Sequence, residues 1–345
     1  MAGIYVHFPF CSSKCIYCDF YSRVRRDWDG YVDVLVREAG ERKDFFKGVP
    51  PSTLYFGGGT PSILPVHQLE RVVKAVSEFL PGGTEWEEFT LECNPDDVTA
   101  AKADELKYLG VNRISMGVQS FVDAHLAWMK RRHTASGAEN SFHILRRAGF
   151  DNISIDLIFG YVGLSDSQWK YSLDRALSLH PEHISCYQMM GRYSSEDEEA
   201  CSRQYILLHD MLQEAGYEHY EISNFALPGY RSRHNGSYWT REPYLGLGAA
   251  AHSFDGDRVR SWNVPDIIQY ESGACQGSET LSDEEILEER IMLGLRTSEG
   301  VERSLLDEAT VSRLIGEGLL AAKEKCVKIA PAHFLVSDNI VRQLI

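Results

Sequence analysis

The sequence lacks the features that would assign it to a membrane or to an oxidising compartment. No run in its 345 residues approaches the 18 apolar residues that a membrane-spanning helix needs. No apolar signal core with a cleavage site is recognisable, so nothing in the sequence indicates secretion. With eight cysteines in such a chain, we expect a cytoplasmic protein with one metal site rather than a disulfide framework.

Basic residues are also in the minority. The chain has 35 Lys and Arg against 50 Asp and Glu, which gives a formal net charge of −15. Nucleic-acid affinity depends largely on neutralisation of phosphates by Lys and Arg, so we expect no nucleic-acid partner. A composition with 43% hydrophobic and 25% charged residues is that of an ordinary globular protein.

Three of the cysteines lie close together near the N-terminus. Cys11, Cys15 and Cys18 have the spacing C-x3-C-x2-C and follow a short apolar strand. Three thiolates can hold three irons of a cubane 4Fe–4S cluster, which leaves the fourth iron open to a small molecule. A zinc ion with His7 as the fourth ligand, or a disulfide pair with a spare thiol, are the alternatives. We expect the remaining cysteines to be small buried hydrophobes, namely Cys93, Cys186, Cys201, Cys275 and Cys326.

The first 190 residues alternate short apolar runs with helical patterns, which predicts parallel βα units. Thr99 is a predicted N-cap and Gly110 a predicted helix stop. The predicted strands are Ile4–Phe8, Thr53–Phe56, Phe89–Glu92, Arg113–Val118, Ile153–Phe159 and His183–Gln188. The predicted helices are Trp28–Phe46, Gln68–Phe79, Ala100–Leu109, Ala138–Ala148 and Gln168–Leu179. Six such units are two short of a closed barrel, so we expect a partial, splayed one.

The predicted strands end in polar residues or glycines, where the chemistry of such barrels is found. These are the Gly57–Gly59 turn, Glu92, Gln119, Asp156 and Tyr187-Gln188. Each has a structural alternative: the glycines could form a plain turn, Glu92 could cap the next segment, and Asp156 could pair with Arg113 or Arg131. Their joint placement favours an active-site rim.

These motifs together resemble the radical S-adenosylmethionine (SAM) superfamily, in which the open iron of the cluster binds SAM. The series YVHFPFC, LYFGGGTPS, TLECNP, RISMGVQSF, RRHT and IDLIFG resembles its coproporphyrinogen III oxidase and HemW group. The resemblance implies an α/β fold with a partial (β/α)6 TIM-like barrel. It implies a 4Fe–4S cluster on Cys11, Cys15 and Cys18, and SAM contacts from Tyr5, Gly58, Gly59, Thr60, Glu92, Gln119, Arg131 and Asp156.

A second motif lies between Tyr217 and Phe254. The string HNxxYW, from His234 to Trp239, resembles the signature of the HemW branch, in which it is implicated in heme binding. A neutral imidazole is a common axial ligand of heme iron, and Tyr238 and Trp239 could cover a porphyrin face. The alternative is that His234 and Tyr238 are core or turn residues with satisfied hydrogen bonds. His252 is a second candidate ligand.

The resemblance implies a heme chaperone that binds heme and passes it to an acceptor protein. Oxidases of the group typically carry a further cysteine where this chain has Phe20, which favours the chaperone over an oxygen-independent coproporphyrinogen III oxidase. A radical SAM enzyme acting on RNA is a third alternative, disfavoured by the acidic composition. No catalytic residue is assigned. The sequence leaves open whether SAM is cleaved, which protein accepts heme, and whether the chain forms a homodimer.

We predict three consecutive regions: the barrel at 1–190, a HemW-like α/β extension at 191–280, and a small winged-helix-like region at 281–345. Ser282–Glu285 is typical of a capping box that opens a helix through Leu295, and Leu305–Leu320 of a second amphipathic segment. Two stretches depart from the family and flank the expected substrate cavity. The first, Gly160–Gly163, lacks the proline of the GLPG motif that is usual in the family. The second, Met189–Glu199, stands in place of an IExGTP-like loop and ends in a run of acidic residues.

Overall fold

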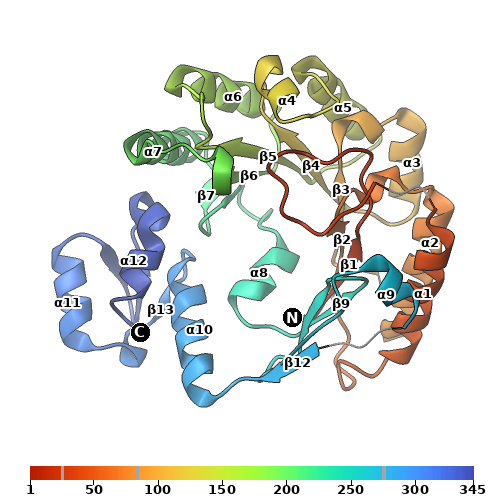
Figure 1. Cartoon of the computed structure of the whole chain (residues 1–345). Helices are drawn as coiled ribbons and strands as arrows, with labels where there is room; N and C mark the ends of the chain where they lie inside the picture. The colour runs from red at the N-terminus through yellow and green to blue at the C-terminus, as the bar shows by residue number, and fades with distance from the viewer. Residues whose placement is uncertain (25–26, 82–84, 274–276) are drawn as a thin grey trace. The chain divides into compact units, whose positions relative to one another are not determined.

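The computed structural model of the chain describes residues 1–24, 27–81, 85–273 and 277–345 (Figure 1). Its residues form two compact units. The first comprises Met1–Ile155 and Glu242–Thr280, and the second comprises Asp156–Arg241 and Leu281–Ile345. Each unit therefore combines two separate stretches of the chain, whereas the regions expected from the sequence are continuous. The boundaries at 190 and 280 stay predictions.

The first unit is built on parallel strands. Its strands β9, β1, β2, β3 and β4 are neighbours in that order, and each of these pairs is parallel. β10, β11 and β12 continue beyond β9 as antiparallel neighbours. The strands are β1 Gly3–Phe8, β2 Thr53–Gly58, β3 Glu88–Cys93, β4 Arg113–Gln119, β9 Tyr244–Leu247, β10 His252–Phe254, β11 Val259–Trp262 and β12 Gly277–Thr280.

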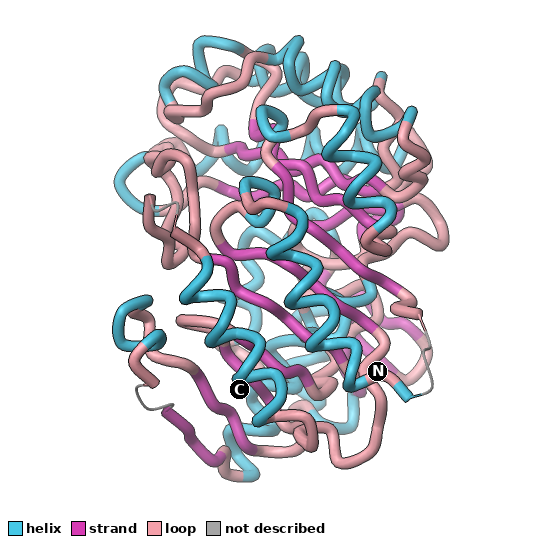
Figure 2. Tube along the Cα trace, turned by 90° about the vertical axis from the view of Figure 1, so that its right-hand side faces the viewer, coloured by secondary structure: helices cyan, strands magenta, loops and turns pink. Residues whose placement is uncertain are grey.

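Helices connect these strands and cover one face. α1 and α2 pack side by side on the outer face of the strands (Figures 1 and 2). In α2, Leu69, Val72 and Val76 are buried, which is the spacing of one helical stripe. The side chain of Thr99 caps α3 at the N–H of Lys102, as predicted. The helices are α1 Asp29–Glu41, α2 Val66–Val76, α3 Ala100–Tyr108, α4 Asp123–Trp128, α5 Ala135–Arg147 and α9 Ile267–Glu271.

The second unit combines a short sheet with a small C-terminal module. β5 (Ile153–Phe159) runs across the boundary between the units, and β6 and β7 both pair antiparallel with β8. The module holds an antiparallel sheet in the order β13-β15-β14. The strands are β6 His183–Gln188, β7 Glu218–His219, β8 Asn224–Ala226, β13 Val301–Glu302, β14 Leu320–Lys323 and β15 Cys326–Ile329. The helices are α6 Asp166–Ser178, α7 Glu198–Glu214, α8 Arg233–Trp239, α10 Asp283–Leu295, α11 Glu308–Gly316 and α12 Ser337–Val341.

The structure confirms the predicted capping box and corrects the predicted end of α1. Ser282 and Glu285 exchange the two capping hydrogen bonds at the start of α10, which runs to Leu295. α1 ends at Glu41, not at Phe46, because the backbone leaves the helical conformation at Arg42 (φ −103°, ψ 12°) and continues in turns through Gly48. Within the amphipathic segment predicted at Leu305–Leu320, α11 ends at Gly316 and Leu320 begins β14.

The predicted burial of the scattered cysteines is confirmed for three of them. Cys93, Cys186 and Cys201 are buried. Cys326 is half-exposed, because β15 alternates between half-exposed and buried residues. Cys275 lies outside the described residues.

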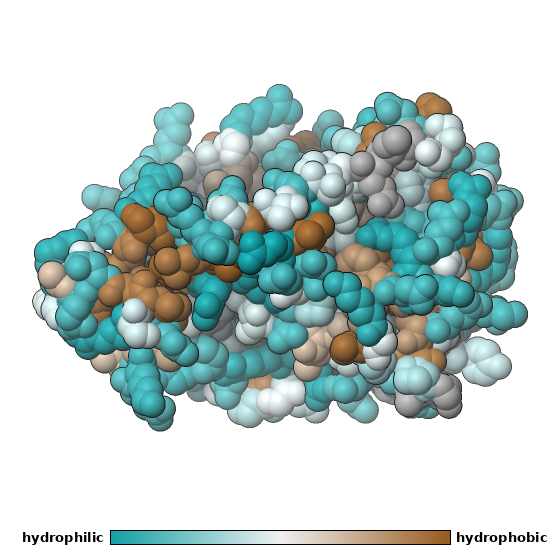
Figure 3. Space-filling model, turned by 90° about the horizontal axis from the view of Figure 1, so that it is seen from below, coloured by the Kyte–Doolittle hydropathy of each residue, from teal (hydrophilic) through white to brown (hydrophobic). Residues whose placement is uncertain are grey.

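No helix within the described parts of the chain is long and apolar enough to cross a membrane. Hydrophilic side chains dominate the face drawn in Figure 3, as the acidic composition leads us to expect.

Candidate functional site

The predicted SAM contacts occupy a distinctive place in the strands. In β1, β2, β3 and β5 every residue is buried except one, and in β4 every residue is buried except two. Strands buried on both faces are normally apolar throughout. Here the half-buried positions are Tyr5, Gly58, Glu92, Gly117, Gln119 and Asp156, which include five of the eight predicted SAM contacts. Four half-buried polar side chains, those of Tyr5, Glu92, Gln119 and Asp156, thus interrupt strands that are otherwise buried.

The Gly57–Gly59 turn at the end of β2 has no room for side chains. A Cβ on Gly57 would lie 2.8 Å from a carboxylate oxygen of Glu92, and one on Gly59 would lie 2.6 Å from the carbonyl oxygens of Phe8 and Phe10. Gly58 has φ +103°, and a Cβ there would overlap the ring of His7. This is not a plain turn, because each glycine leaves its backbone in direct contact with a neighbouring element.

Glu92 fixes this turn from β3. Its carboxylate accepts hydrogen bonds from the Gly58 N–H at 3.1 Å and from the Tyr55 hydroxyl at 2.8 Å. The carboxylate is half-buried and is held beside the glycine turn by these two hydrogen bonds.

His7 is fully engaged inside the protein. Its Nε2–H donates to the Tyr21 carbonyl at 3.0 Å, so Nδ1 accepts from the Tyr5 hydroxyl, also at 3.0 Å. Burial lowers the pKa of His7 to about 4, against a smaller opposing effect of the Tyr21 carbonyl. A zinc-ligand role for His7 would require one of these two hydrogen bonds to break.

The three clustered cysteines lie on the loop between β1 and α1. All are half-exposed free thiols, and burial raises the pKa of Cys11 and Cys18, with a smaller contribution from the neighbouring thiols. Hydrogen-bond donors meet two of them: Thr60 Oγ1 lies 3.6 Å from Cys11 Sγ, and Arg131 Nη1 lies 3.6 Å from Cys15 Sγ. Among the described residues, no group of three or more His, Cys, Asp or Glu side chains is placed to hold a metal ion.

Arg131 is the cation of this site. It also donates to Asn94 Oδ1 at 2.6 Å, to the Gly117 carbonyl and to the Tyr17 hydroxyl. Burial alone would lower the pKa of Arg131, but Tyr17 and Cys15 raise it above its ordinary value. Its Nε is buried and has no hydrogen-bond partner. A buried donor without a partner is costly, so this N–H is suited to a ligand acceptor such as a carboxylate.

Gln119 ends β4 in a strained conformation. Its φ is +70°, which places a non-glycine residue in the left-handed region. Such residues cost free energy and are concentrated at functional sites, which agrees with the predicted role of Gln119. In the second unit, Asp156 is half-buried in β5, and its charge contributes, after burial, to the raised pKa of the Cys186 thiol.

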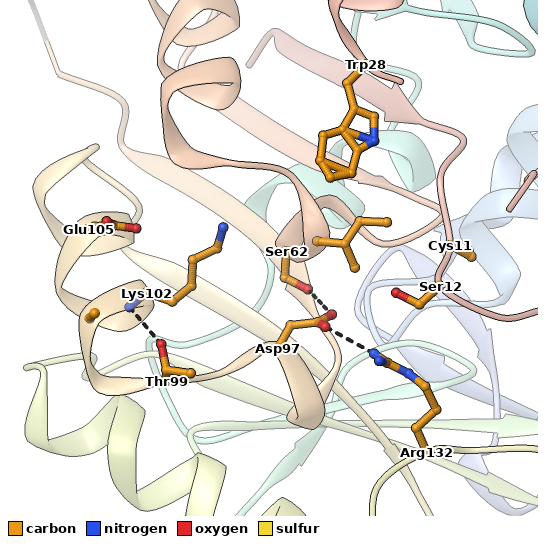
Figure 4. A pocket seen from close by; sticks show the side chains of 11 residues that line it. Cys11, Ser12, Trp28, Ser62, Asp97, Thr99, Lys102, Glu105 and Arg132 are labelled. Carbon is orange, nitrogen blue, oxygen red and sulfur yellow. Dashed lines mark hydrogen bonds and ion pairs between the residues drawn. The ribbon is translucent and has the colours of Figure 1, made fainter. Parts of the chain in front are cut away.

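A pocket of about 520 Å³ opens beside the cysteine loop in the first unit (Figure 4). Cys11 and Ser12 form one wall. Ser62 donates to Asp97, which also accepts from Arg132, and Figure 4 shows these three side chains meeting in the pocket. Cys11 therefore borders a pocket whose lining includes charged side chains.

The HNxxYW motif forms α8, a short helix capped by Ser232. His234 is fully buried, with 0% of its surface exposed, and its Nε2 lies 2.9 Å from the Tyr238 hydroxyl. His234 is therefore a core residue with a hydrogen bond at Nε2, whereas its partner Tyr238 is half-buried. His252 is exposed in β10 and stacks on Trp262, and burial lowers its pKa, with a smaller effect from Arg260.

The two stretches that depart from the family adopt ordered structure. Gly160 and Gly163 have positive φ, and Tyr161 forms an isolated β-bridge with Ser194. The acidic residues Glu198 and Glu199 form the first turn of α7, whose N-cap is Asp197. Carboxylates stabilise a helix N-terminus, so this acidic run begins a helix that sequence reasoning missed.

Comparisons with known proteins identify the family of this chain. Residues 5–176 match the radical SAM superfamily. The chain is 35% identical to the heme chaperone HemW of Bacillus subtilis, over 99% of this chain and 98% of that protein. The chain belongs to the HemW family. It is also 37% identical to the heme chaperone HemW of Lactococcus lactis, over 86% of this chain and 82% of the relative.

The fold of this HemW-family chain is that of a radical SAM protein. The coproporphyrinogen III oxidase HemN of Escherichia coli, a radical SAM enzyme, superimposes with a TM-score of 0.84, covering 99% of this chain and 89% of the other at 22% identity. The α/β barrel fold expected from the sequence is thereby confirmed. Radical SAM proteins hold a 4Fe–4S cluster and SAM, and the donors at Cys11 and Cys15, the free Nε of Arg131 and the bare Gly57–Gly59 backbone fit both groups.

One residue of the site was missed by sequence reasoning. Asn94 lies directly after β3 and bonds both Thr60 and Arg131. The sequence places it at a strand end, two residues after Glu92, but an asparagine before a proline is equally typical of an ordinary turn.

Proposed function

We propose that this protein binds heme and transfers it to an acceptor protein, and that it carries a 4Fe–4S cluster on Cys11, Cys15 and Cys18. The observation that supports this function most is the similarity to HemW heme chaperones over nearly the whole chain. The likeness to HemN supports the shared fold alone. At the position where oxidases have the further cysteine, this chain has Phe20, which is 68% exposed.

In this proposal SAM binds at the strand ends of the first unit. Arg131 offers its free Nε–H to a carboxylate, and Glu92 offers its carboxylate to hydroxyl groups. Bound at the open iron, SAM would supply radical chemistry where a family member uses it. The residues of this chain bind and orient the two groups, and Thr60 and Arg131 donate hydrogen bonds to the cysteines that hold the cluster.

Replacing Cys15 by serine is expected to remove the cluster. Serine cannot supply the soft thiolate that the iron requires. The variant, reconstituted anaerobically, should lack the brown colour and most of the iron bound by the wild-type protein, as measured by absorption and iron analysis. Cys326→Ser is the matched control, because Cys326 is also a half-exposed free thiol, but lies in the C-terminal module. Unchanged iron content in Cys15→Ser would show that the ligand assignment is wrong.

We propose His234 as the heme ligand, which requires its Nε2 to be released from Tyr238. Heme titration of the reconstituted protein should give a saturable Soret shift that His234→Ala loses. Tyr238→Phe keeps the aromatic ring but removes the competing hydroxyl. Since a net hydrogen bond is worth about 1 kcal/mol, this variant should bind heme roughly 5-fold more tightly.

The exposed His67 of α2 provides the control, and its alanine variant should bind heme as the wild-type protein does. If His234→Ala still binds heme saturably and His252→Ala does not, the heme ligand is His252 in β10, and the proposed chaperone function stands. The absence of saturable heme binding in cluster-loaded wild-type protein would overturn the chaperone proposal in favour of the oxidase.

A further inference from the structure

Two of the predicted cluster ligands are joined by one chain of hydrogen bonds, which we call the Asn94 network (Thr60, Asn94 and Arg131). The Asn94 side chain lies at its centre. Its Nδ2 lies 3.1 Å from Thr60 Oγ1, and its Oδ1 accepts from Arg131 Nη2 at 2.6 Å. From the two ends of the network, Thr60 reaches Cys11 and Arg131 reaches Cys15.

The direction of every hydrogen bond in this network is fixed by Arg131. A guanidinium can only donate, so the atom of Asn94 that faces it must be the carbonyl oxygen. The amide nitrogen of Asn94 must then face Thr60, whose oxygen accepts from it. The single hydroxyl proton of Thr60 is thereby left to point at Cys11 Sγ, 3.6 Å away.

The backbone holds the network in place. The Asn94 N–H donates to Ser62 Oγ at 3.3 Å, and Ser62 donates in turn to Asp97 at 2.9 Å. The Thr60 N–H donates to the Phe10 carbonyl at 2.7 Å, directly before Cys11. The side chains of Asn94 and Thr60 are thus oriented by bonds that do not involve the cysteines.

We propose that Asn94 is a positioning residue that sets the polarity of the hydrogen bonds to the cluster and thereby tunes its reduction potential. The inference rests on the proposed cluster. Hydrogen bonds to cysteine sulfur stabilise the more negative, reduced cluster and raise its potential. Asn94 acts through Thr60, because it determines where the Thr60 hydroxyl proton points.

Asn94→Asp is the decisive variant, since it conserves size and still accepts from Arg131. An aspartate oxygen facing Thr60 accepts rather than donates, so the Thr60 proton turns away from Cys11. The midpoint potential of the cluster, titrated without SAM and followed by electron paramagnetic resonance, should fall. Thr60→Val, which removes the same proton without adding charge, should lower it as well.

A double-mutant cycle separates the network from the added charge. If Asn94 acts through Thr60, Asn94→Asp should lower the potential less in the Thr60→Val background than in the wild-type background. Equal shifts in the two backgrounds would overturn the proposal, because they would leave only a charge effect. A loss of iron or of melting temperature with no change in potential would also overturn it, by showing a purely structural role. A wild-type protein that binds no cluster would instead reject the proposed function.

Discussion

Replacing Gly58 by alanine is expected to lower the free energy of unfolding by roughly 2–5 kcal/mol. Gly58 has φ +103°, which an L-residue adopts only with strain. The new Cβ would in addition overlap the ring of His7, which cannot swing aside because hydrogen bonds to Tyr5 and Tyr21 hold both of its nitrogens. Denaturant unfolding under anaerobic, reducing conditions would measure the loss.

Gly110→Ala separates the two causes. Gly110 has a similar φ of +95°, but a Cβ there would meet nothing within 4 Å. It should therefore cost only the backbone strain, about 1–2 kcal/mol. If both variants lost the same stability, the overlap with His7 would contribute nothing, and the close fit of β1 against the glycine turn would be refuted.

Glu221 is expected to make the stability of the protein depend on pH with an unusual sign. Burial raises the pKa of Glu221 to about 7 from the ordinary 4.5, opposed by smaller effects of Ser223 and Asn224. Because the folded protein holds this proton more tightly than the unfolded chain, the contribution of Glu221 is most favourable below pH 4.5. It is lost as the pH rises through 7, by about 3 kcal/mol.

Comparison with Glu221→Gln isolates this contribution, since glutamine mimics the protonated carboxyl. The unfolding free energy of the wild-type protein relative to the variant should fall by about 3 kcal/mol between pH 4.5 and pH 8. Histidines with lowered pKa, such as His7 and His219, act in the opposite direction but cancel in the difference. A difference that stays constant over this range would show that Glu221 ionises normally in the folded protein.

The strands were predictable because their signal is local. A buried strand is a short run with few polar residues, so the predicted bounds of β5 and β6 agree with the structure residue for residue. Helix ends were less predictable, since they depend on distant contacts. Phe46 continues the apolar pattern of α1, yet it lies beyond the helix and contacts the ring of Phe79.

The residues of the candidate site also differ in how far the sequence could predict them. Sequence reasoning identified Glu92 and Arg131 through motifs, because each motif is a short string read along one strand or loop. Asn94 could not be singled out, since its two partners lie 34 and 37 positions away along the chain. The sequence left open whether His234 is a buried residue or a heme ligand, because the residues that cover a side chain are not adjacent to it in sequence.

By itself, the sequence determined the parallel βα order, the cysteine spacing and the HemW-type motifs, since periodicity and spacing act over a few residues. The tertiary structure alone decided which groups engage each other. It placed the Gly58 backbone against His7, the donors of Thr60 and Arg131 on two cysteines, and Tyr238 on the nitrogen of His234. The physical reason is that hydrogen-bond polarity and steric fit depend on atoms within a few ångströms, whatever their separation along the chain.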